Sequence, residues 1–339
     1  MNLTKLADIL KEEPKYRFQQ INQAIFQDFI SDWSAVSSLP KDLRAKLSEE
    51  CPLAITAQIL KNQSRNKSEK ALITLSDGET IETVLIRQKE ERNTVCVSTQ
   101  VGCPLGCAFC ATGDFGFRRN LTSAEIVEQV VFWARYLKNL GRDEKIANIV
   151  FMGMGEPFLN YAEFIKAVKF LNNPETLNIG ARRISVSTAG IVEGIKRLAG
   201  EKLQINLAIS LHAPNDQLRS DLMPIAKKYS IREILKAVDQ YINKTGRRVM
   251  FEYLMIKEVN DREEDALQLV KLMKQPLYLV NLIPYNSTGR FQASSRERIE
   301  KFKKILEDQG VSATVRLSFG ADIAAACGQL KGKFQKRIK

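Results

Sequence analysis

Apolar and polar residues follow two different periods along this chain. Over residues 1 to 60, apolar positions recur at helical spacing in TKLADILKEE, YRFQQINQAIFQDF and KDLRAKLSEE, with a proline between successive segments. Over residues 70 to 88 the pattern changes to an alternation of apolar and polar residues around Asp77 and Gly78. The first pattern predicts a small helical unit, and the second predicts a β-hairpin with its turn at Asp77-Gly78.

After residue 94, short apolar runs alternate with amphipathic stretches. The strand candidates are NTVCVSTQ, IANIVFMG, RRISVST, LQINLAISL, RVMFEYLMI, LYLVNLIPY and SATVRLSFG. Helix start and stop signals lie between them, namely the pairs Thr122/Glu125, Ser230/Glu233 and Asn260/Glu263 and the glycines Gly141, Gly246 and Gly310. Repeated strand and helix units predict a parallel sheet with helices outside it, either open or rolled into a barrel.

Polar and sulfur-containing residues follow several of the predicted strands where each one ends. In parallel α/β folds the carboxyl ends of the strands lie on the same side, and reactive groups collect there. The sequence therefore predicts one site, built from Cys103 to Cys110, Gly153 to Glu156, Ser187, Ser210 to His212, and Asn286.

Lysine and arginine outnumber aspartate and glutamate by 51 to 39, which gives a net charge of +12. Such an excess favours a polyanionic partner, chiefly nucleic acid or an acidic membrane surface, although charge can also serve solubility alone. No apolar run approaches the ~18 residues of a membrane span, and the first residues lack the apolar core of a signal peptide. We therefore expect a cytoplasmic protein without a membrane partner, in which clustered cysteines bind metal or act in catalysis.

Three of the six cysteines, Cys103, Cys107 and Cys110, fall within eight consecutive residues. A structural zinc site and an ordinary [4Fe-4S] cluster each take four protein ligands. Three thiolates can hold three irons of a cubane and leave the fourth iron open to a small substrate, as a vacant position does in catalytic zinc sites. The spacing by itself keeps zinc and a structural cluster as alternatives.

Other candidate residues have two interpretations each on the sequence alone. Glu156 ends the glycine turn FMGMGEP and is either a carboxylate for a ligand ammonium or a helix-start glutamate. His212 is the only histidine, which excludes mechanisms with two histidines and leaves a ligand hydrogen bond or a structural imidazole. Cys96 and Cys327 are either buried small residues or reactive thiols, and small neighbours favour an accessible Cys327 sulfur. We expect Cys51 to be buried and without a role.

The motifs together resemble a known family of enzymes. The three-cysteine spacing resembles the radical S-adenosylmethionine (SAM) superfamily, in which an open iron binds SAM and one electron from the cluster cleaves it to a 5′-deoxyadenosyl radical. From about Tyr16 to Leu330 the chain closely resembles the radical-SAM adenosine RNA methyltransferases, the RlmN/Cfr family. The resemblance rests on STQVGCPLGCAFCATG, GFRRNLT, FMGMGEPFLN, LAISLHAPND, LMPI, NLIPYN and DIAAACGQL.

The resemblance implies a mechanism with two thiols outside the cluster. One SAM methylates Cys327, and a second SAM yields the radical that takes a hydrogen from this S-methyl group. The resulting methylene radical adds to the adenine ring. Cys96 then attacks the Cys327 sulfur, and a disulfide forms as the product leaves. By the same resemblance Glu82 matches the family's proposed proton acceptor.

The resemblance also implies the cofactors and partners. The three clustered cysteines hold one [4Fe-4S] cluster, two SAM molecules are used per turnover, and SAM contacts Gly155, Glu156, Ser187, Ser210, Leu211, His212 and Asn286. The implied substrates are 23S rRNA and tRNA, the latter at the adenosine 3′ of the anticodon. A one-electron donor such as flavodoxin or ferredoxin is expected, and so is a monomer.

Members of the family methylate either C2 or C8 of adenine, and C8 methylation brings antibiotic resistance. QVGCPLGC, GEPFLN and LIPYN resemble the C2 members. The last motif departs from the usual C2 pattern, because Ala324 replaces an aspartate and Ser318-Phe319 is closer to the C8 branch. We expect C2 methylation, and the alternatives are C8 methylation, a non-catalytic iron-sulfur RNA-binding protein and a structural zinc protein.

The strand and helix pattern predicts an α/β protein, and the family resemblance implies an incomplete (β/α)6 TIM-like radical-SAM barrel. The expected parts are a helical RNA-binding accessory domain (1–60), a β-hairpin connector (61–93), the catalytic barrel (94–330) and a basic tail (331–339). Candidate RNA contacts in the accessory domain are Lys15, Arg17, Arg44 and Lys46, and a solvated helical face is the alternative there.

Overall fold

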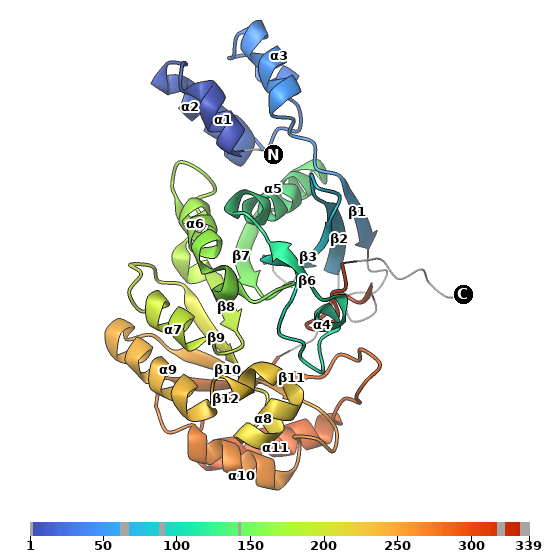
Figure 1. Ribbon diagram of the computed structural model, residues 1–339, viewed down its shortest axis with the longest axis vertical. Helices are drawn as coiled ribbons and strands as arrows, with labels where there is room; N and C mark the ends of the chain where they lie inside the picture. Colours follow the sequence, from blue (N-terminus) through green and yellow to red (C-terminus); the bar gives the residue numbers. More distant parts are fainter. Residues whose placement is uncertain (1–2, 62–67, 88–91, 142–143, 317–322, 333–339) are drawn as a thin grey trace, which may run out of the picture.

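A mixed sheet organises the computed structural model, which describes residues 3–61, 68–87, 92–141, 144–316 and 323–332 (Figure 1). Its described strands pair in the order β1-β2-β3-β4-β7-β8-β9-β10-β11-β12. Pairing is antiparallel from β1 to β4 and parallel from β4 to β12. The strands are β1 (Ala57–Lys61), β2 (Ser68–Thr74), β3 (Thr80–Arg87), β4 (Asn93–Cys96), β7 (Ile146–Phe151), β8 (Ile184–Thr188), β9 (Asn206–Ser210), β10 (Val249–Met255), β11 (Tyr278–Pro284) and β12 (Ala313–Val315).

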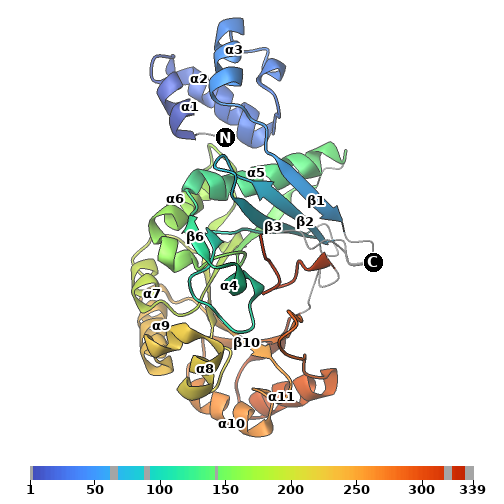
Figure 2. The same cartoon turned by 45° about the vertical axis from the view of Figure 1, so that its right-hand side comes forward.

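Helices follow the parallel strands and cover the outer face of the curved sheet (Figures 1 and 2). In chain order they are α5 (Ser123–Asn139), α6 (Tyr161–Asn172), α7 (Val192–Leu198), α8 (Asp216–Leu222), α9 (Ile231–Thr245), α10 (Glu263–Leu272) and α11 (Arg296–Asp308). The units from β4 to α11 are six strand–helix repeats, and β12 adds a final parallel strand. Because the outer edge of β4 pairs with β3, the barrel stays incomplete, as predicted.

All seven predicted strands of the barrel are present, and two of the predicted helix starts are confirmed. Thr122 and Ser230 each accept a hydrogen bond from the backbone of the glutamate three residues later, which completes the capping boxes of α5 and α9. Gly246 takes the left-handed conformation at the end of α9, with φ of 64°.

The predicted capping role of Asn260 is wrong. Helix α10 begins at Glu263, and Arg262 is its N-cap residue, with its amide bound to Asp265. The Asn260 side chain instead accepts from the Ile256 amide and donates to two backbone carbonyls, those of His212 and Leu254. The fully buried Asn260 amide thus joins the ends of β9 and β10. The spacing of Asn260 to Glu263 in the sequence did not indicate this role.

The connector forms the predicted hairpin but extends further than expected. Strands β2 and β3 pair with Thr74 opposite Thr80 around the Asp77-Gly78 turn. Strand β1 pairs with β2, so the boundary expected at residue 60 falls inside a strand. Since β3 also pairs with β4, the connector is continuous with the barrel sheet.

The N-terminal unit is helical and packs on the barrel through α5 and α6. It contains α1 (Leu3–Leu10), α2 (Lys15–Asn22), a π-helical turn (Gln23–Gln27), a 3₁₀ turn (Trp33–Ala35) and α3 (Lys41–Glu50). Phe26 packs edge-on against Phe170 of α6, and Arg135 of α5 donates to the Leu53 carbonyl at 2.7 Å. Cys51 is fully buried, as predicted, and its carbonyl accepts from the Trp33 indole. One continuous apolar core joins this unit to the barrel.

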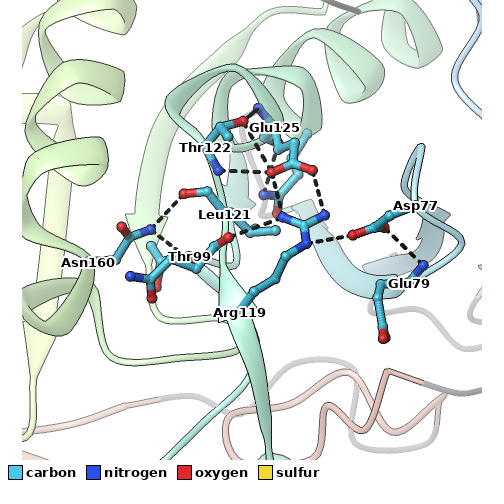
Figure 3. Close-up of polar contacts among 10 residues, drawn as sticks. Asp77, Glu79, Thr99, Arg119, Leu121, Thr122, Glu125 and Asn160 are labelled. Atoms are coloured by element: carbon cyan, nitrogen blue, oxygen red, sulfur yellow. Dashed lines mark hydrogen bonds and ion pairs between the residues drawn. The ribbon is translucent and has the colours of Figure 1, made fainter.

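Arg119 links three segments that meet beside the first strand of the barrel. It lies on β6 (Phe117–Asn120), which pairs with β5 (Gln100–Gly102). Its guanidinium donates to Asp77 in the hairpin turn and to Glu125 in the capping box of α5 (Figure 3). Asn160 holds the same region by donating to the Thr99 and Leu121 carbonyls (Figure 3). This network fixes the chain that leads into the three-cysteine loop.

Candidate functional site

The carboxyl ends of the parallel strands surround a cavity, as the sequence predicts. Its lining includes most of the predicted site residues, namely Cys96, Cys103, Cys107, Cys110, Gly155, Glu156, Ser187, Ser210, His212, Asn286 and Cys327. Helix α4 (Ala111–Phe115) follows the three-cysteine loop, and the C-terminal segment that carries Cys327 lies beside it on the open side of the barrel (Figures 1 and 2). The predicted residues Glu82 and Leu211 do not line this cavity.

The three-cysteine loop turns tightly because its glycines allow conformations that other residues avoid. Gly102 has φ of +77°, and a Cβ on it would lie 1.7 Å from the Gly116 carbonyl oxygen. The Cys103 amide donates to that same carbonyl at 2.9 Å, and the Cys110 amide donates to the Cys107 carbonyl at 3.1 Å. These bonds fix the backbone on which the three thiols are placed.

The donor set of this loop fits an iron-sulfur cluster with three protein ligands. Burial raises the pKa of Cys103 to about 12, and the neighbouring Cys110 is a further cause of the rise; both residues line the cavity. Among the described residues, no group of three or more His, Cys, Asp or Glu side chains is placed to hold a single metal ion. In a cubane each thiolate binds a different iron. Cys103, Cys107 and Cys110 would therefore hold such a cluster from one wall of the cavity.

Glu156 presents a buried carboxylate to the cavity. Its Oε1 accepts from the Phe158 amide at 3.0 Å and its Oε2 from the Ala189 amide at 2.7 Å. Burial raises the pKa of Glu156 to about 7, while these hydrogen bonds oppose the shift. Gly155 precedes it with φ of +96°, and a Cβ there would lie 2.6 Å from the Gln100 side chain. A buried carboxylate held in this way is suited to bind a cationic group of a ligand.

A network of hydroxyl groups and one carboxylate lies at the ends of β8, β9 and β10. The Ser187 hydroxyl donates to Glu252 Oε2 at 2.6 Å and lies 3.2 Å from the Ser210 hydroxyl. Glu252 was missed in the sequence, although a carboxylate within the apolar strand RVMFEYLMI was a usable signal. Its other oxygen pairs with Arg316 at 3.2 Å. Glu252 thus orients Ser210 on the neighbouring strand, at 3.4 Å, and Ser187 two strands away.

His212 has a structural role as well as a place in the cavity wall. Its Nδ1 accepts from the Leu254 amide at 3.1 Å, and its ring packs edge-on against Phe109 at 4.9 Å. The residue adopts φ of 59°, held by Asn260, which donates to its carbonyl. Because Nδ1 is the acceptor, Nε2 carries the proton of the neutral ring and is a donor.

We expect His212 to remain neutral in the folded protein from pH 5 to pH 8. Burial lowers its pKa from 6.5 to about 3, with the charge of Arg219 as a second cause. The unfolded chain therefore takes up a proton below pH 6.5 that the folded chain does not. The stability from this group is fully present above pH 6.5 and lost on acidification, by about 2 kcal/mol at pH 5.

Proton NMR checks this directly, because the chain has one histidine. The imidazole Cε1 proton should keep its chemical shift from pH 5 to pH 8. His212→Asn keeps an acceptor for the Leu254 amide and should lose the corresponding pH dependence in urea unfolding. A resonance that titrates near pH 6.5 would contradict the burial argument.

Leu211, which follows β9, was predicted to contact SAM. It is fully buried outside the cavity lining, and its carbonyl accepts from Arg219 Nε at 3.2 Å. Arg219 is itself fully buried and also donates to the Ala189 carbonyl at 2.6 Å. This arginine, which the sequence analysis did not single out, therefore joins the ends of β8 and β9.

Cys96 and Cys327 face the same part of the cavity. Cys96 ends β4, and burial raises its pKa to about 12, with the nearby Cys327 as the next cause. Both are free thiols in this structure. Arg316, also missed in the sequence, lines the cavity beside them, and its pKa is raised chiefly by Cys327 and also by Glu252 and Cys96. A permanent positive charge is thus available to either thiolate.

Glu82 lies behind the cavity wall. Its side chain is completely buried, pairs with Lys70 at 3.0 Å, and accepts from the Lys331 amide at 2.8 Å. The structure therefore places Glu82 against the segment that carries Cys327, although Glu82 itself does not line the cavity.

Fold and site together define the radical SAM class of enzymes. The sequence profile of the Radical SAM superfamily matches residues 97–270, which include the three-cysteine loop and the strands up to β10. Enzymes of this superfamily use a [4Fe-4S] cluster and SAM. No helix in the described part of the chain is long and apolar enough to cross a membrane.

More specific relatives cover almost the whole chain. A probable dual-specificity RNA methyltransferase RlmN from Dictyoglomus thermophilum is 46% identical over 339 residues, which span 99% of this chain and 96% of the relative. One from Symbiobacterium thermophilum is 44% identical, over 99% of this chain and 91% of the relative. A radical SAM methyltransferase from Sphaerobacter thermophilus, solved by crystallography, superposes with a TM-score of 0.92 at 46% identity over 98% of both chains. This chain belongs to the RlmN family of radical SAM RNA methyltransferases.

Proposed function

We propose that this enzyme methylates C2 of an adenosine in the peptidyl-transferase loop of 23S rRNA and of the adenosine 3′ of the anticodon in tRNA. The observation that carries the proposal is a single cavity that holds three clustered thiols, two further thiols and the polar strand ends. The relatives named dual-specificity RNA methyltransferases support the substrate class.

Cys103, Cys107 and Cys110 hold the cluster and leave one iron open for SAM. When bound, the cluster supplies the electron that cleaves SAM. Glu156 receives the ammonium group of SAM, because it is the buried carboxylate in the same cavity. Gly155, Ser187, Ser210, His212 and Asn286 complete the SAM contacts around it. Leu211 contributes to the SAM site through its backbone, which turns at the end of β9.

Cys327 carries the methyl group between two SAM molecules. Its sulfur takes a methyl from the first SAM by displacement, and the S-methyl group loses a hydrogen atom to the radical from the second. The methylene carbon then bonds to C2 of adenine, and the radical formed gives up one electron, which the cluster would take back. Cys96 loses its thiol proton and attacks the Cys327 sulfur, and the bond from that sulfur to the transferred carbon breaks. C2 gives up its hydrogen as a proton, for which the family resemblance offers Glu82 as the acceptor, and the transferred carbon takes up a proton to become the methyl group. The product is methyladenosine with a disulfide between Cys96 and Cys327, which a reductant must reopen.

RNA binding draws on the net charge of +12 and on the N-terminal unit. Lys15 and Lys46 are exposed, and the exposed aromatic ring of Tyr16 offers a stacking surface. Arg17 and Arg44 instead donate to backbone carbonyls within the unit, so they act mainly by shaping it. The proposal has further parts. The N-terminal helical unit is an RNA-binding accessory domain, and a flavodoxin-type or ferredoxin-type protein donates the electron. The enzyme is a monomer and is located in the cytoplasm.

The test is anaerobic turnover on RNA. Protein reconstituted with iron and sulfide is given SAM, a reductant and unmodified 23S rRNA fragment or tRNA, and the digested RNA is compared with standards by mass spectrometry. We expect 2-methyladenosine from both RNAs. A product with 8-methyladenosine would move the enzyme to the C8 branch, and no methyladenosine from either RNA would overturn the proposal.

The C8 alternative rests on the departures in the last motif. Ala324 is described and adopts a left-handed φ of 51°, a conformation that aspartate tolerates better than alanine. Ser318 and Phe319 lie outside the described residues, as does most of the basic tail. The chain-wide similarity to the RlmN relatives favours C2.

A further inference from the structure

The segment that carries Cys327 is attached on both sides to one buried ion pair. Lys70 on β2 donates to the Ala324 carbonyl, three residues before Cys327, at 3.0 Å. Glu82 on β3 accepts from the Lys331 amide, four residues after it, at 2.8 Å. Lys70 and Glu82 lie 3.0 Å apart, so a single pair holds both ends of the segment.

Both partners of the pair are removed from water. The Lys70 side chain is 4% exposed and that of Glu82 is 0% exposed. Breaking a buried pair on one side leaves an uncompensated charge, which is more costly than removing both partners. The backbone of Glu82 is also fixed, because the Glu82 carbonyl accepts from the Ser98 hydroxyl and the Glu82 amide donates to the Met154 sulfur.

The segment also contacts the loop after β11, where Asn286 donates to the Cys327 carbonyl at 3.5 Å and Gln329 donates to the Ser287 carbonyl at 3.0 Å, and Thr80 of β3 donates to the Gly332 carbonyl. Further contacts come from the cluster side. The Ala111 amide donates to the Gly328 carbonyl at 2.7 Å, and the Thr112 hydroxyl donates to the Leu330 carbonyl at 2.7 Å. These two bonds fix the chain just after Cys327 on the cluster side. The described chain before Cys327 is held at Ala324, whose left-handed conformation turns its carbonyl to Lys70. Lys70 is thus the polar anchor of the upstream side.

We propose that Lys70 and Glu82 are positioning residues that hold the Cys327 sulfur in the cavity for methylation and for attack by Cys96. The inference rests on the proposed function. It gives Glu82 a task on the methyl-carrying segment in addition to the proton transfer implied by family resemblance. The pair contacts the segment at Ala324 and Lys331, so we expect its removal to change the placement of Cys327.

The experiment compares Lys70→Met, Glu82→Gln and the double variant with the wild-type protein. Arg87→Met is the matched control, because it removes another ion pair of β3, that with Glu144, without touching the segment. The first readout is the rate at which iodoacetamide alkylates Cys327 in protein without cluster, resolved by peptide mass spectrometry. The second is S-methylation of Cys327 after reconstitution with iron, sulfide and SAM.

We expect Lys70→Met to lower the S-methylation rate of Cys327 by about 10- to 100-fold, the range that misplacement of a reacting group causes. Alkylation of Cys327 should become faster, while Arg87→Met leaves both rates unchanged. Bound iron and SAM cleavage should stay at the wild-type level. The double variant should be less impaired than the product of the single effects, because it leaves no unpaired buried charge.

Two outcomes would overturn the inference. One is an unchanged alkylation and methylation rate in Lys70→Met. The other is a Glu82→Gln protein that methylates Cys327 normally but stops at a later step, which is the result expected of a proton acceptor. If wild-type Cys327 is never methylated, the proposed function fails, and the alkylation rates still test the attachment of the segment.

Discussion

Replacing Cys107 by alanine removes the iron-sulfur absorbance of the reconstituted protein and brings SAM cleavage below detection. The same result is expected for Cys103 and Cys110, since each of the three thiols would bind a different iron. Cys107 and its partners come from one loop, with its turn fixed by Gly102 and the Gly116 carbonyl. Iron content, absorbance and 5′-deoxyadenosine yield measure the loss.

The matched control is Cys327→Ala, which changes a thiol in the same cavity. This variant should bind iron and cleave SAM at the wild-type level while transferring no methyl group to RNA. The contrast separates the thiols that hold the cluster from the thiol that carries the methyl group. Methyladenosine formed by Cys327→Ala, or full iron binding by Cys107→Ala, would contradict these assignments.

The sequence predicted the barrel because its strands and helix starts depend on local pattern. The apolar runs gave all seven parallel strands, and Thr122 and Ser230 capped their helices as expected. The site at the strand ends followed from the same logic, since parallel strands bring their carboxyl ends together whatever loops follow. Local chemistry at a turn, such as that of Asp77-Gly78 in the hairpin, was also predicted from the sequence.

Residues that act through long-range contacts could not be predicted in the same way. Glu252 meets Ser187 from two strands away, and Arg316 meets Cys96 and Cys327 only because β12 and β4 border the same cavity. Asn260 had capping spacing to Glu263, yet its burial directed its amide to His212 instead. Apart from Arg316 and Cys327, which are close in the sequence, each partner lies tens of residues away or more, so the spacing along the chain carried no information about the contact.

The ion pair of Lys70 and Glu82 is another long-range contact that the sequence could not predict. A lysine and a glutamate in an alternating hairpin are ordinarily solvated, and β-hairpin pattern alone gives them no reason to be buried. They are buried here because the C-terminal segment covers that face of β2 and β3. The role of Lys70 in the hairpin therefore depends on its contact with Ala324, which lies 254 positions away in the sequence.

Cys96→Ala should leave the enzyme joined covalently to its RNA substrate. In the proposed sequence Cys96 supplies the thiol that attacks the Cys327 sulfur and releases the transferred carbon. Cys96 is fixed for this attack, because Thr83 donates to its carbonyl at 2.7 Å and its backbone pairs with Val84 and Val150. Alanine keeps the packing of β4 but has no sulfur, so the bond between Cys327 and adenine has no route to break.

Denaturing gel electrophoresis with labelled RNA measures this outcome. Cys96→Ala should give a protein band that carries RNA and disappears on nuclease treatment, with at most one RNA bound per enzyme and no released methyladenosine. Cys51→Ala is the control, since Cys51 is buried under the N-terminal helices and lines no part of the cavity. That variant should turn over normally. Normal turnover by Cys96→Ala would mean that another group opens the bond to Cys327, and the two-thiol mechanism would then be wrong.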